Sequence, residues 1–258
     1  MDTIETVSLK RKSIESDIPM SIEDHIEEFR KRVIYILLGA SICVIVCLFI
    51  GPKLISYVRE LYISIMVSEN LEPRLQILAP SDGFITYIKI SVFAGVTLAA
   101  PWIFYHLWQY MATGLYPSEK RLVNIAAPIS AVLFISGAFF FLKVVAPFTL
   151  RFFIVFNKTL LGAESSFTFQ KYISFITQMI LIFGFAFQTP TAIFFLNKAG
   201  VVSQKTLSAY RKYVILAVFI IAAIITPPDF VSQITLAIPL YLLFELGILM
   251  SHIMNRKG

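Results

Sequence analysis

Apolar runs about as long as a lipid bilayer is thick are the feature that most constrains this chain. An α-helix needs roughly 20 consecutive apolar residues to cross the hydrocarbon core. The sequence predicts four such spans, followed by two shorter ones: 33–51, 85–111, 123–146, 173–196, 213–225 and 231–250. The chain is 57% hydrophobic and 15% charged, with a mean hydropathy of +0.78, which excludes a soluble domain. We expect an all-α polytopic membrane protein with six transmembrane helices, the last two of them short.

Six spans would place both termini on one side of the membrane, and the basic residues indicate which side. Lysines and arginines concentrate in the N-terminal segment, the second and fourth predicted loops and the C-terminal tail. Cytoplasmic segments of membrane proteins carry such an excess. We expect a multi-pass protein of the bacterial inner membrane with cytoplasmic termini; a thylakoid membrane with stromal termini is the alternative. The net charge of +6 reflects this asymmetry and does not indicate nucleic-acid binding.

Residues that commonly form catalytic or metal sites are scattered in this sequence. Cys43 and Cys47 lie one helical turn apart in the first predicted span, where they would pack as small apolar side chains. His25, His106 and His252 have no cysteine or carboxylate at metal-ligand spacing, and no nucleophile motif or phosphate-binding loop occurs. We expect no enzymatic activity and neither a metal nor another cofactor.

The N-terminal region changes character along its length. Residues 1–19 are polar and of mixed charge, so we expect a mobile extension in front of a membrane domain at 20–258. Residues 21–24 have the form of a capping box, and apolar residues then recur at helical spacing, which predicts a helix in the membrane interface. Glu28 lies off this stripe with Arg32 four residues ahead, a spacing that favours an exposed ion pair of about 0.2–0.5 kcal/mol.

Segment 100–121 is typical of a helix that leaves the membrane. It carries Tyr105, Trp108 and Tyr110 and ends in a polar turn that contains Glu119, and Tyr and Trp gather where hydrocarbon meets water. Two interpretations of Glu119 stay open. It stabilises the positive end of the next helix dipole, which the local pattern favours, or it receives a cationic segment together with a second carboxylate.

Two connections are expected on the outer face. Connection 52–84 combines an amphipathic stretch with Pro73, Pro80 and Gly83, which predicts a cap of short helices. The second external loop is expected at 147–172.

The later spans contain polar groups and are short. An amide at Gln188 needs hydrogen-bond partners in hydrocarbon, and Pro190 removes a donor and bends the helix close by. Gln188 either bonds a neighbouring helix or marks a groove that accepts a passing segment, and both interpretations stay open. Span 213–225 would be about 20 Å long against about 30 Å of hydrocarbon. Bilayer thinning or association with other helices accommodates such a mismatch.

Six motifs occur in order along the chain: HIEEFRKR at 25–32, APWIFYHLW at 100–108, GLYPSEKR at 114–121, FGFAFQTP at 183–190, TPPDFVSQ at 226–233 and AIPLYLLFELG at 237–247. Together they resemble the TatC family, the receptor subunit of the twin-arginine protein translocase. The resemblance covers about residues 20–252. It implies six helices in a concave, glove-like bundle and a non-enzymatic receptor that exports folded proteins with the proton-motive force.

The resemblance also implies site residues and partners. The positions that bind twin-arginine signal peptides of folded precursors correspond to Glu28, Glu119, Arg30 and Arg121. The positions linked to TatA- and TatB-type single-span partners correspond to Gln233, Pro227, Pro228 and Asp229. A homo-oligomer within a larger complex is expected. The sequence departs from the family pattern at Gln188, where many members have Glu, at Thr113, commonly Pro, and at Phe29, commonly Leu.

The chemistry of an arginine pair suits two carboxylates. A guanidinium binds a carboxylate through two parallel hydrogen bonds, which an ammonium cannot copy, but exposed ion pairs contribute only about 0–1 kcal/mol each. We therefore expect Glu28 and Glu119 to select the arginines while a groove at Gln188 retains the apolar part of the signal. The main alternative is a small-molecule or ion permease that uses Gln188, Lys143 and Glu245 as intramembrane polar groups. An intramembrane enzyme and a scaffold without cargo are further alternatives.

Overall fold

The computed structural model describes residues 22–113, 120–160, 162, 167–198, 202–225 and 230–255, and these residues are almost entirely helical. The helices are α2 (Ile22–Ser68), α3 (Asp82–Thr113), α4 (Lys120–Phe140), a π-helical turn (Phe141–Val145), α5 (Ala146–Leu160), α6 (Phe169–Ala186), α7 (Thr189–Lys198), α8 (Gln204–Ala209), α9 (Arg211–Ile225) and α10 (Phe230–Asn255). The strands β1 (Leu75–Gln76) and β2 (Phe167–Thr168) pair in parallel. The predicted extension at 1–19 and the first residue of the predicted capping box lie outside the described residues.

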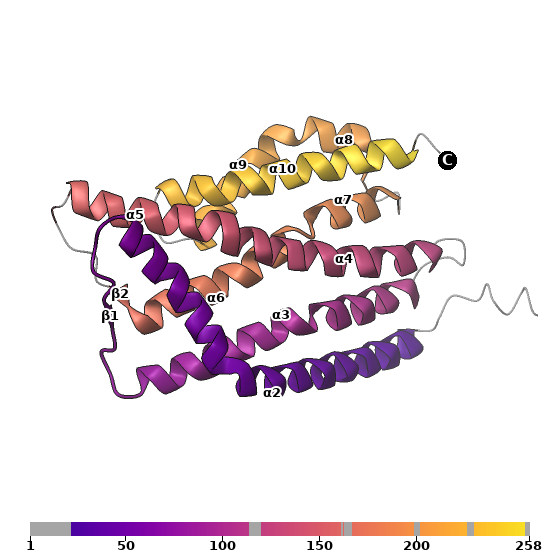
Figure 1. Ribbon diagram of the computed structural model, residues 1–258. Coiled ribbons are helices and arrows are strands. Elements are labelled where there is room, and N and C mark those ends of the chain that lie inside the picture. The colour runs from indigo at the N-terminus through magenta and orange to yellow at the C-terminus, as the bar shows by residue number, and fades with distance from the viewer. Residues whose placement is uncertain are drawn as a thin grey trace, which may run out of the picture.

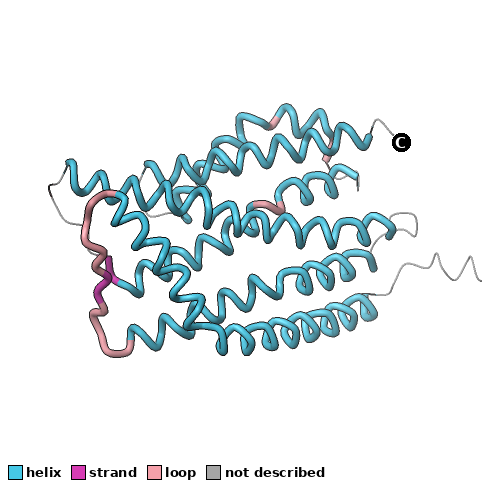
Figure 2. The backbone as a smooth tube through the Cα atoms, viewed as in Figure 1, coloured by secondary structure: helices cyan, strands magenta, loops and turns pink. Residues whose placement is uncertain are grey.

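The long helices run lengthwise between two ends of the molecule (Figure 1). At one end, here called the termini end, α2 begins at Ile22, α3 ends at Thr113, α4 begins at Lys120 and α10 ends at Asn255. At the opposite end, here called the ladder end, β1 and β2 pair, and most of the described loop backbone gathers there (Figure 2). The described chain therefore begins and ends on the same side of the bundle.

Four segments of the described chain are long and apolar enough to cross a membrane: Glu23–Ser68, Asp82–Thr113, Val123–Leu160 and Phe169–Asn197. They match the four long predicted spans. Helix α9 has 15 residues, and the apolar part of α10, Gln233–Leu249, is also shorter, so the count of six spans stays a prediction. Large apolar side chains on the outside are typical of lipid-facing surfaces; Phe49, for example, is 83% exposed.

Helix α2 is longer than the sequence predicts. The prediction of short helices directly after residue 51 is wrong, because α2 passes through Pro52 and continues to Ser68, with a sharp change of direction part-way along (Figure 1). Proline bends a helix without necessarily ending it. Beyond the bend, Val58 and Tyr62 face the core and are 5% and 0% exposed, and this burial stabilises the extra turns.

The third predicted span also continues past its expected end. The loop predicted to begin at Pro147 is helical as far as Leu160. A π-helical turn precedes it, in which the N–H of Ala146 donates to the carbonyl of Phe141. This turn resets the hydrogen-bond register just before Pro147, so the missing N–H falls in the first turn of α5, where a proline is tolerated.

The bend predicted near Pro190 is present. Helix α6 ends at Ala186 and α7 begins at Thr189, and the intervening N–H of Gln188 donates to the carbonyl of Phe185 at 2.9 Å. Because Pro190 has no N–H, the helical hydrogen-bond ladder cannot continue through it. The fourth span is therefore interrupted, and consists of the two helices α6 and α7.

Candidate functional site

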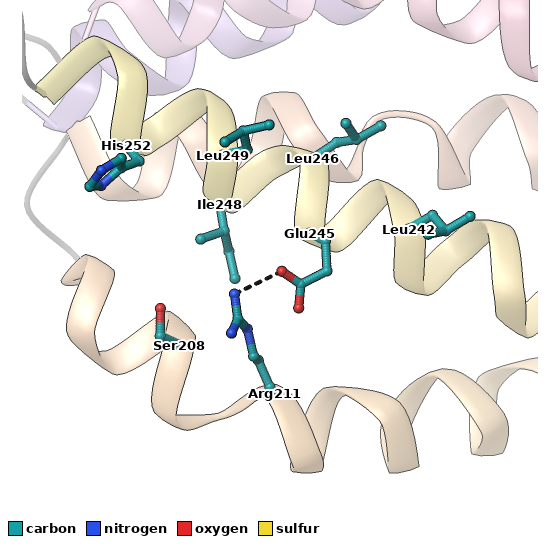
Figure 3. A pocket seen from close by; sticks show the side chains of 8 residues that line it. All are labelled: Ser208, Arg211, Leu242, Glu245, Leu246, Ile248, Leu249 and His252. Carbon is teal, nitrogen blue, oxygen red and sulfur yellow. Dashed lines mark hydrogen bonds and ion pairs between the residues drawn. The ribbon is translucent and has the colours of Figure 1, made fainter.

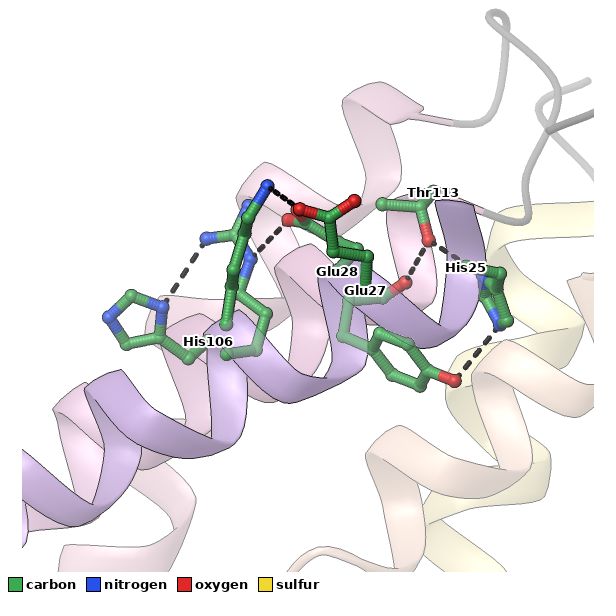
Figure 4. A network of polar contacts seen from close by, with 8 residues as sticks. His25, Glu27, Glu28, His106 and Thr113 are labelled. Atoms are coloured by element: carbon green, nitrogen blue, oxygen red, sulfur yellow. Dashed lines mark hydrogen bonds and ion pairs between the residues drawn. The ribbon is translucent and has the colours of Figure 1, made fainter. Parts of the chain in front are cut away.

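Glu28 and Arg32 face one another on α2 at the termini end, as their spacing predicts. The Nε of Arg32 donates to Oε1 of Glu28 at 2.6 Å, and each side chain is 23% exposed. The same guanidinium reaches α3, where its Nη1 lies 3.3 Å from Nδ1 of His106. Figure 4 shows Glu28 on α2 and His106 on α3, the two residues that this guanidinium connects. The pair is thus part of an interhelical network rather than an isolated surface contact.

A second polar cluster clamps the start of α2 onto the end of α3. The ring of His25 stacks on Tyr110 at 4.8 Å, and the hydroxyl of Tyr110 lies 2.9 Å from Nε2 of His25. The hydroxyl of Thr113 donates to the carbonyl of Tyr110 at 2.7 Å and lies 3.3 Å from Nδ1 of His25 (Figure 4). One neutral tautomer of His25, with the proton on Nδ1, satisfies the whole cluster.

The other residues of the predicted signal-peptide site are only partly described. Arg30 is exposed on α2. Glu119 and the side chain of Arg121 lie outside the described residues. The described residues that flank Glu119 are Thr113, which ends α3, and Lys120, which begins α4, and both lie at the termini end with Glu28 (Figure 1).

Gln188 bonds a neighbouring helix. Its Nε2 donates to the main-chain carbonyl of Ser130 on α4 at 2.8 Å. The hydroxyl of Ser130 in turn accepts from Nε1 of the buried Trp108 on α3 at 2.8 Å. Three helices thus share one polar junction. Of the two interpretations of the Gln188 amide, this supports the bond to a neighbouring helix and not the groove.

The α9–α10 hairpin is held by polar contacts near both of its ends. The Nε2 of Gln233 donates to the carbonyl of Phe219 at 2.9 Å. At the termini end, Arg211 pairs with Glu245 at 2.9 Å, and Tyr241 donates to the same carboxylate at 2.8 Å. Pro227, Pro228 and Asp229, the remaining predicted partner-binding residues, lie outside the described part of the chain.

An open groove of about 950 Å³ runs beside this hairpin. Leu242, Leu246 and Leu249 give it an apolar wall, and Arg211 and Glu245 face each other within it (Figure 3). Within the described residues, no three His, Cys, Asp or Glu side chains gather closely enough to hold a metal ion.

Sequence reasoning missed the long-range members of these networks. The pairing of Glu28 with Arg32 follows from their spacing, but His106 is 74 residues from Arg32 and Ser130 is 58 residues from Gln188. No local pattern relates residues that far apart.

Comparisons with known proteins give a consistent result. The sequence model of the family described as Sec-independent protein translocase protein (TatC) matches residues 24–239. The chain belongs to the TatC family. It is 34% identical over 234 residues to the Sec-independent protein translocase protein TatC of Helicobacter pylori (strain J99), with 91% of this chain and 90% of the relative covered. The TatC protein of Aquifex aeolicus is 34% identical over 242 residues, with 92% and 97% covered.

The fold agrees with a solved TatC structure. A crystal structure described as that of the twin arginine translocase receptor TatC superimposes with a TM-score of 0.78 at 32% identity, covering 89% of this chain and 98% of the other. The chain is therefore a polytopic helical membrane protein and a TatC component of a Sec-independent protein translocase. The permease hypothesis has less support, because Gln188 and Glu245 are engaged within the protein and Lys143 lies 5.7 Å from the centre of the Tyr57 ring.

Two departures from the TatC pattern have structural roles. Thr113, in place of a common proline, supplies the hydroxyl that contacts both Tyr110 and His25. Phe29, in place of a common leucine, lies 5.2 Å from the Tyr110 ring. Both substitutions therefore contribute to the clamp between α2 and α3.

Proposed function

We propose that this chain is the receptor subunit of a twin-arginine translocase. It binds the two arginines of a signal peptide with the carboxylates of Glu28 and Glu119, with Arg30 and Arg121 nearby. It carries out no chemistry on the cargo. Folded precursors are exported by the assembled complex with the energy of the proton-motive force.

The observation that carries this proposal is that the Glu28 carboxylate already binds a guanidinium. Arg32 contacts it at 2.6 Å, in a setting where both side chains are only partly exposed. A carboxylate that accepts one arginine in this environment has the geometry to accept another. Because α3 ends and α4 begins at the same end of the bundle, the connection that carries Glu119 starts and finishes on the Glu28 side.

Two ion pairs are too weak to hold a cargo protein. Each contributes about 0–1 kcal/mol when exposed, so most of the affinity must come from the apolar part of the signal at about 25 cal/mol per Å² removed from water. Gln188 belongs to the polar junction beside the path proposed for that apolar part, and its bond to Ser130 keeps α4 and α6–α7 together there. The carboxylates then select the signal, and apolar contacts retain it.

The termini end is proposed to face the cytoplasm of a bacterium, across its inner membrane. The described α2 and α9 carry basic residues at this end, including Arg30, Lys31, Arg32, Arg211 and Lys212. Such an excess of Lys and Arg is characteristic of cytoplasmic segments. Signal peptides would then meet Glu28 before they cross the membrane.

The α9–α10 hairpin is the proposed contact for TatA- and TatB-type single-span proteins. Its outer faces are apolar; Ile224 and Ile238 are 77% and 54% exposed. The segment between the two helices contains Pro227, Pro228 and Asp229, and Gln233 follows it. Further copies of the chain would join these proteins in the complete complex.

Crosslinking of a twin-arginine signal peptide tests the receptor role. Photoactivatable probes at residues 28 and 119 should both react with an Arg-Arg peptide, and less with a matched Lys-Lys peptide. Glu28→Gln should reduce the preference for Arg-Arg over Lys-Lys roughly fivefold, since one ion pair of about 1 kcal/mol is lost.

Glu27→Gln is the matched control. Glu27 is the neighbouring carboxylate and pairs with Lys31, but its side chain is 63% exposed. This variant should keep the preference of the unmodified protein. An unchanged preference in the Glu28→Gln, Glu119→Gln double variant would refute the proposal.

A further inference from the structure

Arg32 is held from two sides. Its Nε bonds Glu28 at 2.6 Å, and its Nη1 contacts His106 at 3.3 Å. Glu28 alone would give a local pair between residues four apart, which helices commonly carry. The contact with α3 adds a second anchor that fixes where the guanidinium lies.

Packing holds the His106 ring in position to accept a hydrogen bond from this guanidinium. Its side chain is 5% exposed, stacked on Tyr35 at 5.5 Å and packed edge-on against Trp102 at 4.4 Å. The indole of Trp102 is itself fixed, because its Nε1 donates to the carbonyl of Tyr35 at 2.8 Å. The imidazole therefore has little freedom to turn away.

The contact also defines the proton on the ring. A guanidinium can only donate hydrogen bonds, so Nδ1 of His106 must accept. The ring is then neutral, with its proton on Nε2. A neutral imidazole anchors Arg32 without repelling it, and so favours the arrangement in which Arg32 lies against Glu28.

The neighbouring ion pair on α2 lacks this protection. The Lys31 and Glu27 side chains are 57% and 63% exposed, against 23% for both members of the Arg32–Glu28 pair. Solvent screens the first pair far more than the second. The chain thus places a guanidinium, and not the adjacent ammonium, in the shielded position next to Glu28.

We propose that Arg32 is an internal competitor for the Glu28 carboxylate and that His106 positions it there. This inference rests on the receptor function proposed above. A two-bond contact from an incoming arginine needs both oxygens of the Glu28 carboxylate. Arg32 occupies Oε1, so the incoming arginine must displace it and the free site is only fractionally open. Apparent affinity falls by the open fraction, and this fraction is the same whichever peptide arrives. Arg32 therefore sets a common threshold of affinity, below which weakly binding Lys-Lys peptides are not retained.

Peptide affinity of the purified full-length chain in lipid nanodiscs tests the competitor. Arg32→Gln should tighten binding of an Arg-Arg signal peptide about fivefold, the gain expected when a hydrogen-bonded charged partner no longer occupies the acceptor. A matched Lys-Lys peptide should tighten by the same factor. His106→Phe keeps the aromatic packing but removes the acceptor for Arg32, and should give a smaller gain of about twofold.

Two further variants distinguish competition for the Glu28 carboxylate from a general effect of positive charge on peptide affinity. Lys31→Gln removes the same positive charge one residue away and should change affinity by less than about 1.5-fold, because Lys31 is exposed. In a Glu28→Gln background, Arg32→Gln should give no gain, since the competitor acts through that carboxylate. An equal gain in that background, or with Lys31→Gln, would overturn the competitor in favour of simple repulsion.

The same series distinguishes the two proposals. If Glu28→Gln lowers the Arg-Arg preference but Arg32→Gln leaves affinity unchanged or weaker, the receptor function stands and the competitor fails. If Glu28→Gln changes nothing, the receptor site itself is wrong and the competitor falls with it.

Discussion

The two ends of the molecule hold their carboxylates in different ways. At the termini end, Glu28 pairs with a residue of its own helix, four positions away. At the ladder end, Glu69 pairs with Arg151 of α5, 82 residues away, at 2.6 Å. Lys158 also donates to the main-chain carbonyl of Glu69 at 3.0 Å, close to the paired strands β1 and β2.

This difference separates an exchangeable contact from a structural one. Displacing Arg32 from Glu28 leaves α2 intact, because both residues stay on the same helix and the clamp at Tyr110 remains. Displacing Arg151 from Glu69 removes a tie between the end of α2 and α5. Under the proposed receptor function, this asymmetry lets the termini end admit a peptide while the ladder end keeps its shape.

The largest loss of stability is expected from Gly95→Ala, which disturbs the packing of α2 on α3 that both ends of the molecule depend on. A Cβ at Gly95 on α3 would lie 2.5 Å from Cα of Val44 on α2, so the two backbones must separate. Overpacking of this kind costs about 1–3 kcal/mol. Thermal unfolding in detergent should show the loss, and amide exchange should rise along residues 30–50 more than at the ladder end.

Gly83→Ala is the control for that prediction. Gly83 lies on the same helix, but its Cβ would meet nothing within 4 Å. The control should be as stable as the unmodified chain or slightly more stable. Equal losses in the two variants would show that α2 and α3 are not in contact at Gly95.

Glu69→Gln should lower stability by about 1 kcal/mol, since it removes a charge-assisted hydrogen bond between α2 and α5. Signal-peptide affinity should not change. Unfolding and peptide binding measured on one preparation give both readouts. Glu72→Gln serves for comparison, because the Glu72 side chain is 79% exposed against 17% for Glu69; a similar loss there would contradict the structural role assigned to Glu69.

Tyr110→Phe should lower the free energy of unfolding somewhat less, by about 0.5–1 kcal/mol, because it removes one hydroxyl contact to His25 and keeps the stacked rings. The effect should be confined to the termini end, where amide exchange of residues 22–32 should accelerate. Tyr57→Phe changes a tyrosine on α2 that is 48% exposed and should have no such effect. Acceleration at the ladder end would mean that the two ends are coupled.

The smallest effect is expected midway between the ends. Gln188→Met keeps the length of the side chain but removes the donor to Ser130, and hydrogen bonds between helices in membranes average about 0.6 kcal/mol. A small loss of stability with an unchanged Arg-Arg preference would fit an interhelical bond. A large loss of peptide affinity with no loss of stability would instead favour the groove.

Much of the fold follows from local pattern. Apolar runs predicted the four long spans, and Pro190 predicted the break in the fourth. The errors share one pattern, because the loops expected at 52–84 and 147–172 each begin at a proline, Pro52 or Pro147, through which the helix in fact continues. Each proline lies where the chain bends or changes register, and burial of residues such as Tyr62 beyond it makes continuation favourable. Local sequence does not contain that burial energy.

For the candidate site, too, local contacts could be predicted from the sequence and contacts between helices could not. The pairing of Glu28 with Arg32 follows from helical geometry, and the TatC motifs pointed to Glu28 as a site residue. That His106 lies against Arg32, or Ser130 against Gln188, depends on how α2 packs on α3 and α6 on α4. Side-chain spacing within one helix carries no information on such contacts.

By itself the sequence determined that this chain spans a membrane and where its long helices run, because hydrocarbon constrains the length and polarity of each segment separately. The sequence motifs also indicated which carboxylates to test. The tertiary structure alone decided how far Glu28 is shielded and that His106 of another helix lies against the Arg32 guanidinium. A guanidinium four residues away becomes a competitor only when a neutral imidazole from another helix holds it in place.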